Sequence, residues 1–430
     1  MDAMSVANRE RAMRRRTLTL ALLTLVYLFS YMDRYILAIL LELIKKDLRL
    51  SDTQLGLLSG FAFAVFYATL GLPVARLADR SNRRNIIAVA LALWSAMTAA
   101  CGLAGNFVQL LAARIGVGVG EAGSGPPSHS IIADLYPPEK RAGAMAIFSS
   151  GVVLGGSLGT IVGGLVAAQH GWRVAIMTVG LPGIALAIIV RLFVIEPERG
   201  QSEAPDRVAP AAEAMPSAWS AFLSMWRSGP AFHVVMGVTL TSLIGYAVSQ
   251  FGPSFLQRSL GMTLTQVSVY IAPVAAVMGV VSGVGGGKLA DWAGRRWGIH
   301  AQAWLVAILK VIALPFAILF YLSHSITTGM TMYAVYLLFA SSYLGPSFAL
   351  IQTLAPIRMR AMWAAVTLLV INLIGLGLGP TLVGVLSDLL KPYVGPQDSL
   401  RYALVIVVAA GPWTVYHYWR AGVLLKRGER

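Results

Sequence analysis

Residues 287–296 read Gly-Lys-Leu-Ala-Asp-Trp-Ala-Gly-Arg-Arg, and residues 75–84 read Ala-Arg-Leu-Ala-Asp-Arg-Ser-Asn-Arg-Arg. Both stretches contain Leu-Ala-Asp and end in Arg-Arg, and they start 212 residues apart. A second pair of similar stretches begins at Pro137 and Pro356, which are 219 residues apart. Because two separate pairs have similar spacing, the sequence predicts a chain built from two similar halves.

The sequence around these loops is strongly apolar. Hydrophobic residues make up 57% of the 430 and charged residues 12%, whereas soluble domains carry about 25% charged residues. A helix that spans a bilayer needs about 20 mostly apolar residues. The stretches that meet this requirement are 17–41, 54–78, 85–104, 107–133, 142–168, 174–195, 230–256, 264–289, 300–322, 329–354, 361–386 and 401–420. The predicted fold class is an all-α membrane protein with twelve transmembrane helices.

A polar segment divides these helices into two groups of six. Residues 196–218 are rich in Pro, Ala and charge, a composition that is typical of a solvated linker. We therefore expect an N-terminal six-helix bundle over 1–195, a cytoplasmic linker over 196–229 and a C-terminal bundle over 230–430. Two parallel repeats imply a pseudo-two-fold axis along the membrane normal, with a binding cavity between the halves. We expect a monomer.

The few charged residues are mostly basic. Lys and Arg number 34 and Asp and Glu 19, which gives a net charge of +15. In a chain this apolar, the basic excess indicates contact with membrane lipids and no nucleic-acid partner. With both termini in the cytoplasm, inner segments hold 24 of the 34 basic residues and outer loops hold seven, as the positive-inside rule requires. We expect a multi-pass protein of the cell (inner) membrane with both termini cytoplasmic.

Motifs of the common enzyme classes are missing from the sequence. We find no Gly-x-x-x-x-Gly-Lys-Ser/Thr loop, no His-Glu-x-x-His and no Cys/His cluster with metal-ligand spacing. The single Cys101 cannot form an intramolecular disulfide. We therefore predict a protein that is not an enzyme, with no catalytic residue, no metal and no cofactor apart from a proton as coupling ion.

The repeated loops can serve topology or gating. An acid at the inner end of a helix, flanked by basic residues, can pair across the cytoplasmic side and hold it closed. For Asp79 and Asp291 we favour such a latch, because topology alone requires no acid there; for the arginines, topology is an equal explanation. The predicted cytoplasmic gate comprises Asp79, Arg80, Arg83, Arg84, Arg141, Asp291, Arg295 and Arg296.

Five charged residues fall inside apolar stretches, where each costs about 2.5–3.5 kcal/mol on insertion scales. They are Asp33, Arg34, Arg114, Glu121 and Lys310. The first four lie on the predicted helices 17–41 and 107–133, which cross the membrane in opposite directions. A rise of about 1.5 Å per residue puts Asp33 and Arg114 at nearly the same depth. Glu121 lies two turns after Arg114 on the same face, so we expect the four charges to form one neutral cluster.

Two interpretations of this cluster stay open. It can be a structural ion-pair network, or a protonation switch, which we favour. An apolar environment favours the neutral acid and a neighbouring arginine favours the carboxylate, so Asp33 or Glu121 can change its charge as water access alternates. Proton release lets the acid pair with an arginine, and proton uptake frees that arginine for an anionic substrate. We interpret Lys310, the one charge inside its helix, as structural.

Glycine and proline residues predict close packing and a break. Glycines recur at four-residue intervals at positions 151, 155, 159 and 163 of helix 142–168. Such a row presents no side chains and lets another helix approach closely. Pro126 and Pro127 must break or kink helix 107–133.

The pattern of residues 287–296 is the signature loop of the major facilitator superfamily, which the whole chain resembles. The first half also resembles the Spinster family of lysolipid and sphingolipid transporters within that superfamily, whereas the second half matches at superfamily level only. Gly159-Thr160-Ile-Val-Gly163-Gly164 is similar to the superfamily's antiporter motif, with Thr160 in place of its proline. The stretches that carry the Spinster resemblance are Tyr31-Met-Asp33-Arg34-Tyr35, Asp79-Arg80-Ser-Asn82-Arg83, Trp94-Ser95, Arg114…Gly118-Val-Gly120-Glu121-Ala122 and Ala133-Asp134-Leu135…Arg141.

The resemblance implies a secondary transporter with proton-coupled alternating access for a lysolipid or sphingolipid-like substrate. It implicates Asp33 and Glu121 in proton coupling and Arg34 and Arg114 as charge partners, with Arg34 the better candidate for the substrate headgroup. The superfamily lines its cavity with helices one, four, seven and ten, although ordinary packing also explains the aromatic residues there. From the second half these helices offer Tyr246, Gln250, Phe251, Tyr336, Phe339 and Tyr343. A proton-coupled transporter of a small organic anion or drug is the alternative, because it would use the same charges.

Overall fold

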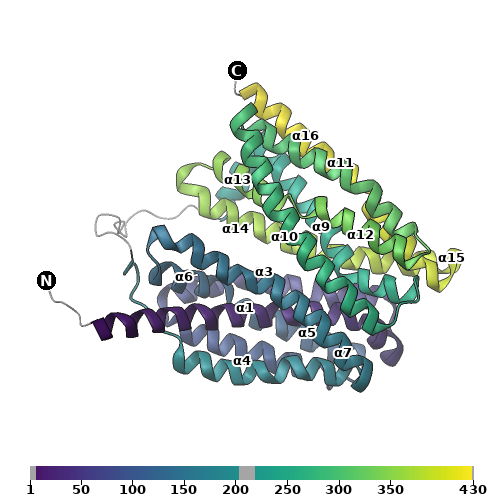
Figure 1. Ribbon diagram of the computed structural model, residues 1–430, viewed down its shortest axis with the longest axis horizontal. Coiled ribbons are helices and arrows are strands. Elements are labelled where there is room, and N and C mark those ends of the chain that lie inside the picture. The colour runs from purple at the N-terminus through teal and green to yellow at the C-terminus, as the bar shows by residue number, and fades with distance from the viewer. Residues whose placement is uncertain (1–5, 203–217, 429–430) are drawn as a thin grey trace. The chain divides into compact units, whose positions relative to one another are not determined.

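The computed structural model describes residues 6–202 and 218–428, and every regular element in these ranges is a helix. The chain forms two compact units (Figure 1). Unit 1 comprises Met1–Ile44 and Val65–Glu213, and unit 2 comprises Lys45–Ala64 and Ala214–Arg430. The all-α class predicted from the sequence is confirmed.

The described part of unit 1 contains six helices. They are α1 (Val6–Leu48), α3 (Ala62–Arg80), α4 (Arg83–Cys101), α5 (Phe107–Glu121), α6 (Gly125–Leu135) and α7 (Pro138–Phe193). The last residues of α1 and the first three of α3 belong to unit 2. Asparagine is the N-cap residue of two of these helices. The side-chain oxygen of Asn82 accepts a hydrogen bond from a backbone N–H of α4, and that of Asn106 accepts one from a backbone N–H of α5.

Unit 2 contains the remaining helices. They are α2 (Asp52–Gly56), the π-helix η1 (Leu57–Phe61), α8 (Ala218–Arg227), α9 (Gly229–Arg258), α10 (Leu264–Trp297), α11 (His300–Leu322), α12 (Ile326–Ala340), α13 (Leu344–Leu354), the 3₁₀-helix η3 (Ile357–Met359), α14 (Arg360–Val370), the π-helix η4 (Ile371–Leu378), α15 (Gly379–Ala409) and α16 (Gly411–Gly428). Ser51 begins α2 through a capping box with Gln54. The α2 segment packs against α15, so part of the first predicted bundle lies in unit 2.

Nine stretches in the described ranges are long and apolar enough to cross a membrane. The predicted helix 142–168 and nearly all of 174–195 fall within the single stretch Pro138–Phe193, but Gly171 interrupts it with a φ of 81°. Gly395, with a φ of 80°, interrupts α15 in the same way. Such angles suit glycine, which has no side chain to clash with the backbone. The count of twelve transmembrane helices stays a prediction.

The glycine row of α7 packs directly on α1. A Cβ atom on Gly159 would lie 2.6 Å from the carbonyl oxygen of Met32, and one on Gly151 would lie 2.9 Å from that of Thr24. Cβ atoms at such distances would clash, so the row allows the two backbones to touch. The predicted close approach of a second helix is confirmed, and α1 is the helix that makes it.

Each unit contains a helix that is broken in mid-course. In unit 1 the chain turns at 122–124, between α5 and α6, and in unit 2 it turns at 341–343, between α12 and α13. The two turns are 219 residues apart, the same spacing as the loops at Pro137 and Pro356. Each turn precedes a proline at the start of the next helix, where its missing N–H costs no hydrogen bond. The break predicted from Pro126 and Pro127 is therefore present and repeated.

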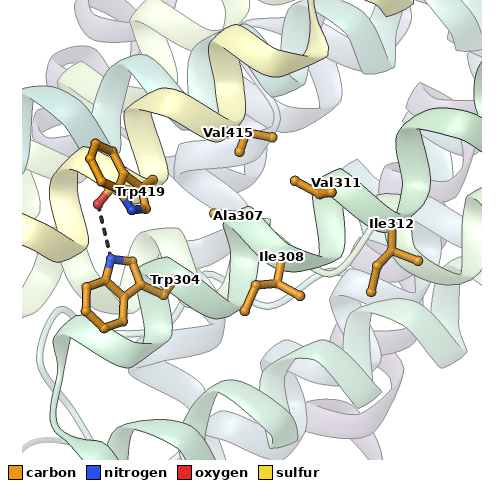
Figure 2. Close-up of a pocket in the computed structure, with 7 residues that line it drawn as sticks. All are labelled: Trp304, Ala307, Ile308, Val311, Ile312, Val415 and Trp419. Atoms are coloured by element: carbon orange, nitrogen blue, oxygen red, sulfur yellow. Dashed lines mark hydrogen bonds between the residues drawn. The ribbon is translucent and has the colours of Figure 1, made fainter.

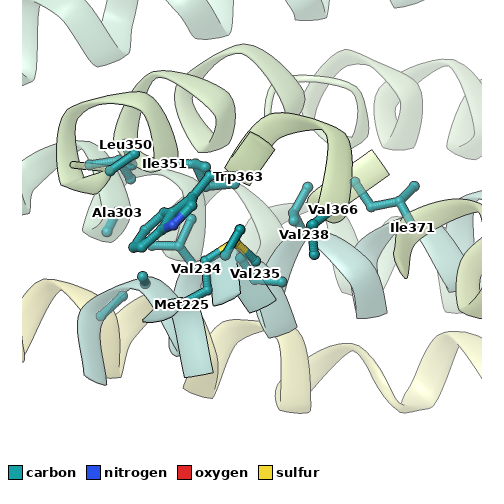
Figure 3. Close-up of a cluster of buried hydrophobic side chains, with 14 of the residues drawn as sticks. Met225, Val234, Val235, Val238, Ala303, Leu350, Ile351, Trp363, Val366 and Ile371 are labelled. Carbon is teal, nitrogen blue, oxygen red and sulfur yellow. The ribbon is translucent and has the colours of Figure 1, made fainter. Parts of the chain in front are cut away.

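Helix α8 lies within residues 196–229, which the sequence analysis treats as a linker. Residues 203–217 of that segment lie outside the described part. Helix α8 joins the core of unit 2, where Met225 packs with Val234 of α9 and Trp363 of α14 (Figure 3). The indole N–H of Trp363 donates to Ser224 Oγ at 2.9 Å. These contacts anchor the end of the linker to the second half.

Candidate functional site

Helix α1 presents a polar face in the interior of unit 1. Ser30 and Arg34 are four residues apart and therefore share one side of the helix. Asp33 is turned about 100° from Arg34 and faces a different neighbour. This arrangement lets one helix present an acid and a base to separate partners.

The polar face of α1 binds Glu121, the last residue of α5. The Arg34 guanidinium donates to Glu121 Oε2 from Nε at 2.9 Å and from Nη2 at 2.8 Å, and Ser30 Oγ donates to the same oxygen at 2.7 Å. Glu121 is 1% exposed. Its other oxygen, Oε1, is buried and has no hydrogen-bond partner in the described part of the chain.

Two tyrosine rings enclose the Arg34 guanidinium. Its central carbon lies 4.9 Å from the ring centre of Tyr31 and 4.6 Å from that of Tyr67, on α3. Rings at these distances attract a cation through their negative faces. The tyrosines therefore hold the guanidinium in place without neutralising it.

Asp33 binds a different helix. Its Oδ2 accepts from Thr98 Oγ1 of α4 at 2.6 Å, whereas Oδ1 is buried without a hydrogen-bond partner among the residues described. Asp33 is 2% and Arg114 4% exposed. Arg114 and Glu121 both lie within electrostatic range of Asp33. The structure thus gathers all four membrane charges of the first half in one cluster, in which Asp33, Arg114 and Glu121 are buried and Arg34 is half-buried.

The two carboxylates of this cluster share one bonding pattern. Each carboxylate has one oxygen in hydrogen bonds and one buried oxygen without a partner in the ranges 6–202 and 218–428. An unpaired buried polar atom costs about 1–3 kcal/mol, and more if it is charged. A proton on that oxygen would remove the charge, while the hydrogen bonds to the other oxygen hold the side chain in place. The sequence identified the charged residues but not Ser30, Tyr67 or Thr98, which are common residue types in apolar helices.

Arg83 is the centre of a second charged cluster in unit 1. Its guanidinium pairs with Asp134 of α6 and, through Nε at 2.7 Å, with Glu196. It also donates to Ser130 Oγ at 2.8 Å and to the Pro197 carbonyl at 2.7 Å. Its side chain is 1% exposed. Arg83 therefore fastens the segment after α7 to the ends of α4 and α6.

The other predicted gate residues of unit 1 differ in their surroundings. The backbone N–H of Arg84 donates to Glu196 at 2.8 Å, and the side chain of Arg141 donates to the Ala133 carbonyl at 3.0 Å. Arg80 is exposed, and the side chain of Asp79 lies outside the described residues. The sequence analysis did not include Asp134 or Glu196 in the gate, although both bind Arg83.

In unit 2, the gate residues Asp291, Arg295 and Arg296 are exposed at the end of α10. The predicted cavity residues vary in burial: Phe251, Gln250 and Tyr336 are buried, whereas Tyr246, Phe339 and Tyr343 are half-buried. Of this set, Tyr343 makes a polar contact, because its hydroxyl lies 3.1 Å from Ser242 Oγ.

Lys310 binds the break between α12 and α13. Its ammonium donates to the carbonyl of Ala340, the last residue of α12, and lies 4.3 Å from the ring centre of Tyr343. A cation at a helix C-terminus is favourable, because the last carbonyls there lack helical partners. This geometry agrees with the structural interpretation of Lys310.

A third charged cluster lies in unit 2 and is centred on Asp52 of α2. Arg258, at the end of α9, donates to both carboxylate oxygens at 2.7 and 2.8 Å. Lys45 pairs with the same carboxylate, and Ser387 Oγ donates to it at 2.7 Å. The sequence analysis did not identify this pairing of Lys45 and Arg258 with Asp52.

Comparisons with known proteins agree with this architecture. The Major Facilitator Superfamily matches residues 23–380. An MFS-type efflux pump of Mycolicibacterium smegmatis is 33% identical over 417 residues, which cover 96% of this chain and 94% of the pump. Protein spinster homolog 1 of Xenopus laevis is 28% identical, over 93% of this chain and 79% of its own length.

A solved structure is also similar over nearly the whole chain. It is the crystal structure of a bacterial homologue of the human lysosomal transporter Spinster, in an inward-facing and unoccupied conformation. It is 29% identical, with a TM-score of 0.85, over 96% of this chain and 98% of the other. The family match, the relatives and the fold together lead to one conclusion: the chain belongs to the Major Facilitator Superfamily and is a membrane transporter, not an enzyme.

Proposed function

We propose that this transporter couples proton movement to the transport of a lysolipid or sphingolipid-like amphipathic substrate across the cytoplasmic membrane. The Spinster resemblance of the first half supports the substrate class. The buried pairing of Arg34 with Glu121, inside a tyrosine pair, is the observation that carries the proposal.

The proposed coupling step is an exchange of partners at Arg34. When Glu121 is ionised, its carboxylate accepts the hydrogen bonds of the Arg34 guanidinium. A proton on Glu121 removes that charge and leaves Arg34 with a buried positive charge that requires a new anion. A lysolipid phosphate provides that anion, and guanidinium groups bind phosphate through two parallel hydrogen bonds. Proton uptake at Glu121 therefore favours headgroup binding at Arg34.

Asp33 is the second proton-binding group in this proposal. It lies next to Arg34 in the chain but bonds to Thr98, and Arg114 is the neighbouring cation. A change of charge on Asp33 alters the net charge of the same cluster, next to α4. Asp33 links α1 to α4, and Glu121 links α5 to α1. Proton binding to these two acids therefore changes the contacts among all three helices.

Transport by reconstituted protein tests the proposal. Proteoliposomes with an imposed proton gradient are given a panel of labelled lysolipids, and uptake is compared with that of small organic anions. We expect gradient-dependent lysolipid movement in the wild type, its loss in Glu121→Gln and Asp33→Asn, and its retention in Glu139→Gln, which changes an exposed acid of the same unit. Lysolipid movement that ignores the gradient would contradict proton coupling, and no lysolipid movement would contradict the substrate class.

A proton-coupled transporter of a small organic anion or drug is the second candidate. The likeness to the efflux pump of Mycolicibacterium smegmatis, 33% identical over 96% of this chain, supports transport by this chain without favouring a lipid. Both candidates use Arg34 and Glu121, so the panel assay separates them by substrate.

A further inference from the structure

A groove lies on the surface of unit 2 between α11 and α16 (Figure 2). Its volume is about 440 Å³, and Ala307, Ile308 and Val311 line it from α11. Val415 and Trp419 line it from α16. This volume lies within the range of about 300–1,000 Å³ that is typical of ligand pockets.

Glycine contacts bring the two helices together on either side of the groove. At one end, a Cβ on Gly422 of α16 would clash with the Trp304 ring of α11. Toward the other end, a Cβ on Gly411 would lie 3.0 Å from Leu314 Cδ1. Between these close approaches, Ala307 and Val415 have short side chains that do not fill the space. The hollow is therefore a consequence of the packing of α11 on α16.

The lining favours a hydrocarbon occupant. The side chains that face the groove are alanine, isoleucine, valine and tryptophan. The indole N–H of Trp304 donates to the Trp419 carbonyl at 3.2 Å (Figure 2), so it is already engaged. Polar groups of a ligand would lose hydrogen bonds to water here without replacing them.

The tryptophan end of the groove is basic. Lys426 lies 5.3 Å from the ring centre of Trp304. It shares the face of α16 that carries Trp419, because the two are seven residues, or two turns, apart. Arg427 is the next residue and is turned about 100° away from that face. Tryptophan and lysine at the end of a membrane helix are typical of the level of the lipid headgroups.

We propose that this groove binds an anionic phospholipid of the surrounding bilayer, with an acyl chain along Ala307 and Val415 and the phosphate beside Lys426. The charge of Lys426 at the mouth selects an anionic headgroup, and the apolar lining selects the chain. This lipid would stay bound to the lipid-facing surface of the transporter and would not be transported. The inference therefore does not depend on the proposed substrate.

Quenching of tryptophan fluorescence tests this site. The protein is placed in nanodiscs that contain a few per cent of a lipid brominated on its acyl chains, either phosphatidylglycerol or phosphatidylcholine. Bromine quenches nearby indoles, and Trp304 and Trp419 border the groove. We expect stronger quenching by the anionic lipid. The variant Lys426→Gln should reduce this preference about five-fold, because one lysine near the surface contributes about 1 kcal/mol.

Two further variants separate the groove from general attraction of lipid. Ala307→Phe fills the hollow and should abolish the preference for the anionic lipid. Arg427→Gln removes one positive charge at the neighbouring position and should leave this preference unchanged. Unchanged thermal melting shows that each variant is folded, and Lys426 is exposed, so its substitution leaves the packing intact. Equal quenching by the two lipids, or an equal effect of Arg427→Gln, would overturn the proposal. So would a dimer in the nanodisc that Ala307→Phe dissociates, because a second copy would then occupy the groove.

Discussion

Replacing Arg83 with glutamine is expected to destabilise unit 1 by about 3 kcal/mol. Removal of one partner from a buried ion pair typically costs about 3–5 kcal/mol, because the other charge stays buried. Here the side chains that stay behind, Asp134 and Glu196, are 14% and 22% exposed. Water therefore reaches both carboxylates partly, which places the cost at the low end of that range.

The buried thiol of Cys101 offers a local assay for this prediction. It is the only cysteine in the sequence and the last residue of α4, the helix that begins with Arg83. A thiol-reactive dye therefore reports the unfolding of unit 1 during a temperature ramp. We expect Arg83→Gln to react at a clearly lower temperature than the wild type.

Arg84→Gln is the matched control, because the contact of Arg84 with Glu196 is made by its backbone N–H and survives the substitution. Arg83→Lys should give an intermediate result, since an ammonium keeps the charge but cannot form the same fork of bonds. If Arg84→Gln lowered the reaction temperature as much as Arg83→Gln, the role assigned to the Arg83 side chain would be wrong.

Two further predictions concern packing and the third charged cluster. Gly159→Ala should destabilise unit 1 by about 1–3 kcal/mol, because its Cβ would overlap the backbone of α1; Gly143→Ala on the same helix, with open space around it, should be neutral or stabilising in the same thiol assay. Asp52→Asn should destabilise unit 2 by about 3 kcal/mol, because Arg258 and Lys45, which water partly reaches, lose their shared anion. Tryptophan fluorescence during heating measures this, since eight of the ten tryptophans lie in unit 2, and an unchanged melting curve would refute it.

Features with a local signal were predicted well from the sequence. The repeated loops indicated the superfamily, which the comparisons confirm. Asp33, Arg34, Arg114 and Glu121 stood out because charges are costly inside apolar helices. Their depth could be worked out from the helix rise alone, and the structure brings the four together in one cluster.

Contacts between distant residues carried no such signal. Arg83 is 113 residues from Glu196, and Asp52 is 206 residues from Arg258. Each of these residues lies near the end of a helix, where a charge is unremarkable, so only the packing of the helices reveals the pairs. The same reason explains why Thr98 was missed: a threonine in an apolar helix becomes informative only once Asp33 is known to face it.

The most direct test of proton coupling by Asp33 and Glu121 is to measure, as a function of pH, the balance between inward-open and outward-open conformations. Pairs of spin labels on each side of the membrane give the distances that change with this balance. We predict a pH-dependent shift in the wild type and no shift once both Asp33→Asn and Glu121→Gln are present, with each single variant losing part of the response or all of it. Distances that still respond to pH in the double variant, as they do in the wild type, would contradict the account.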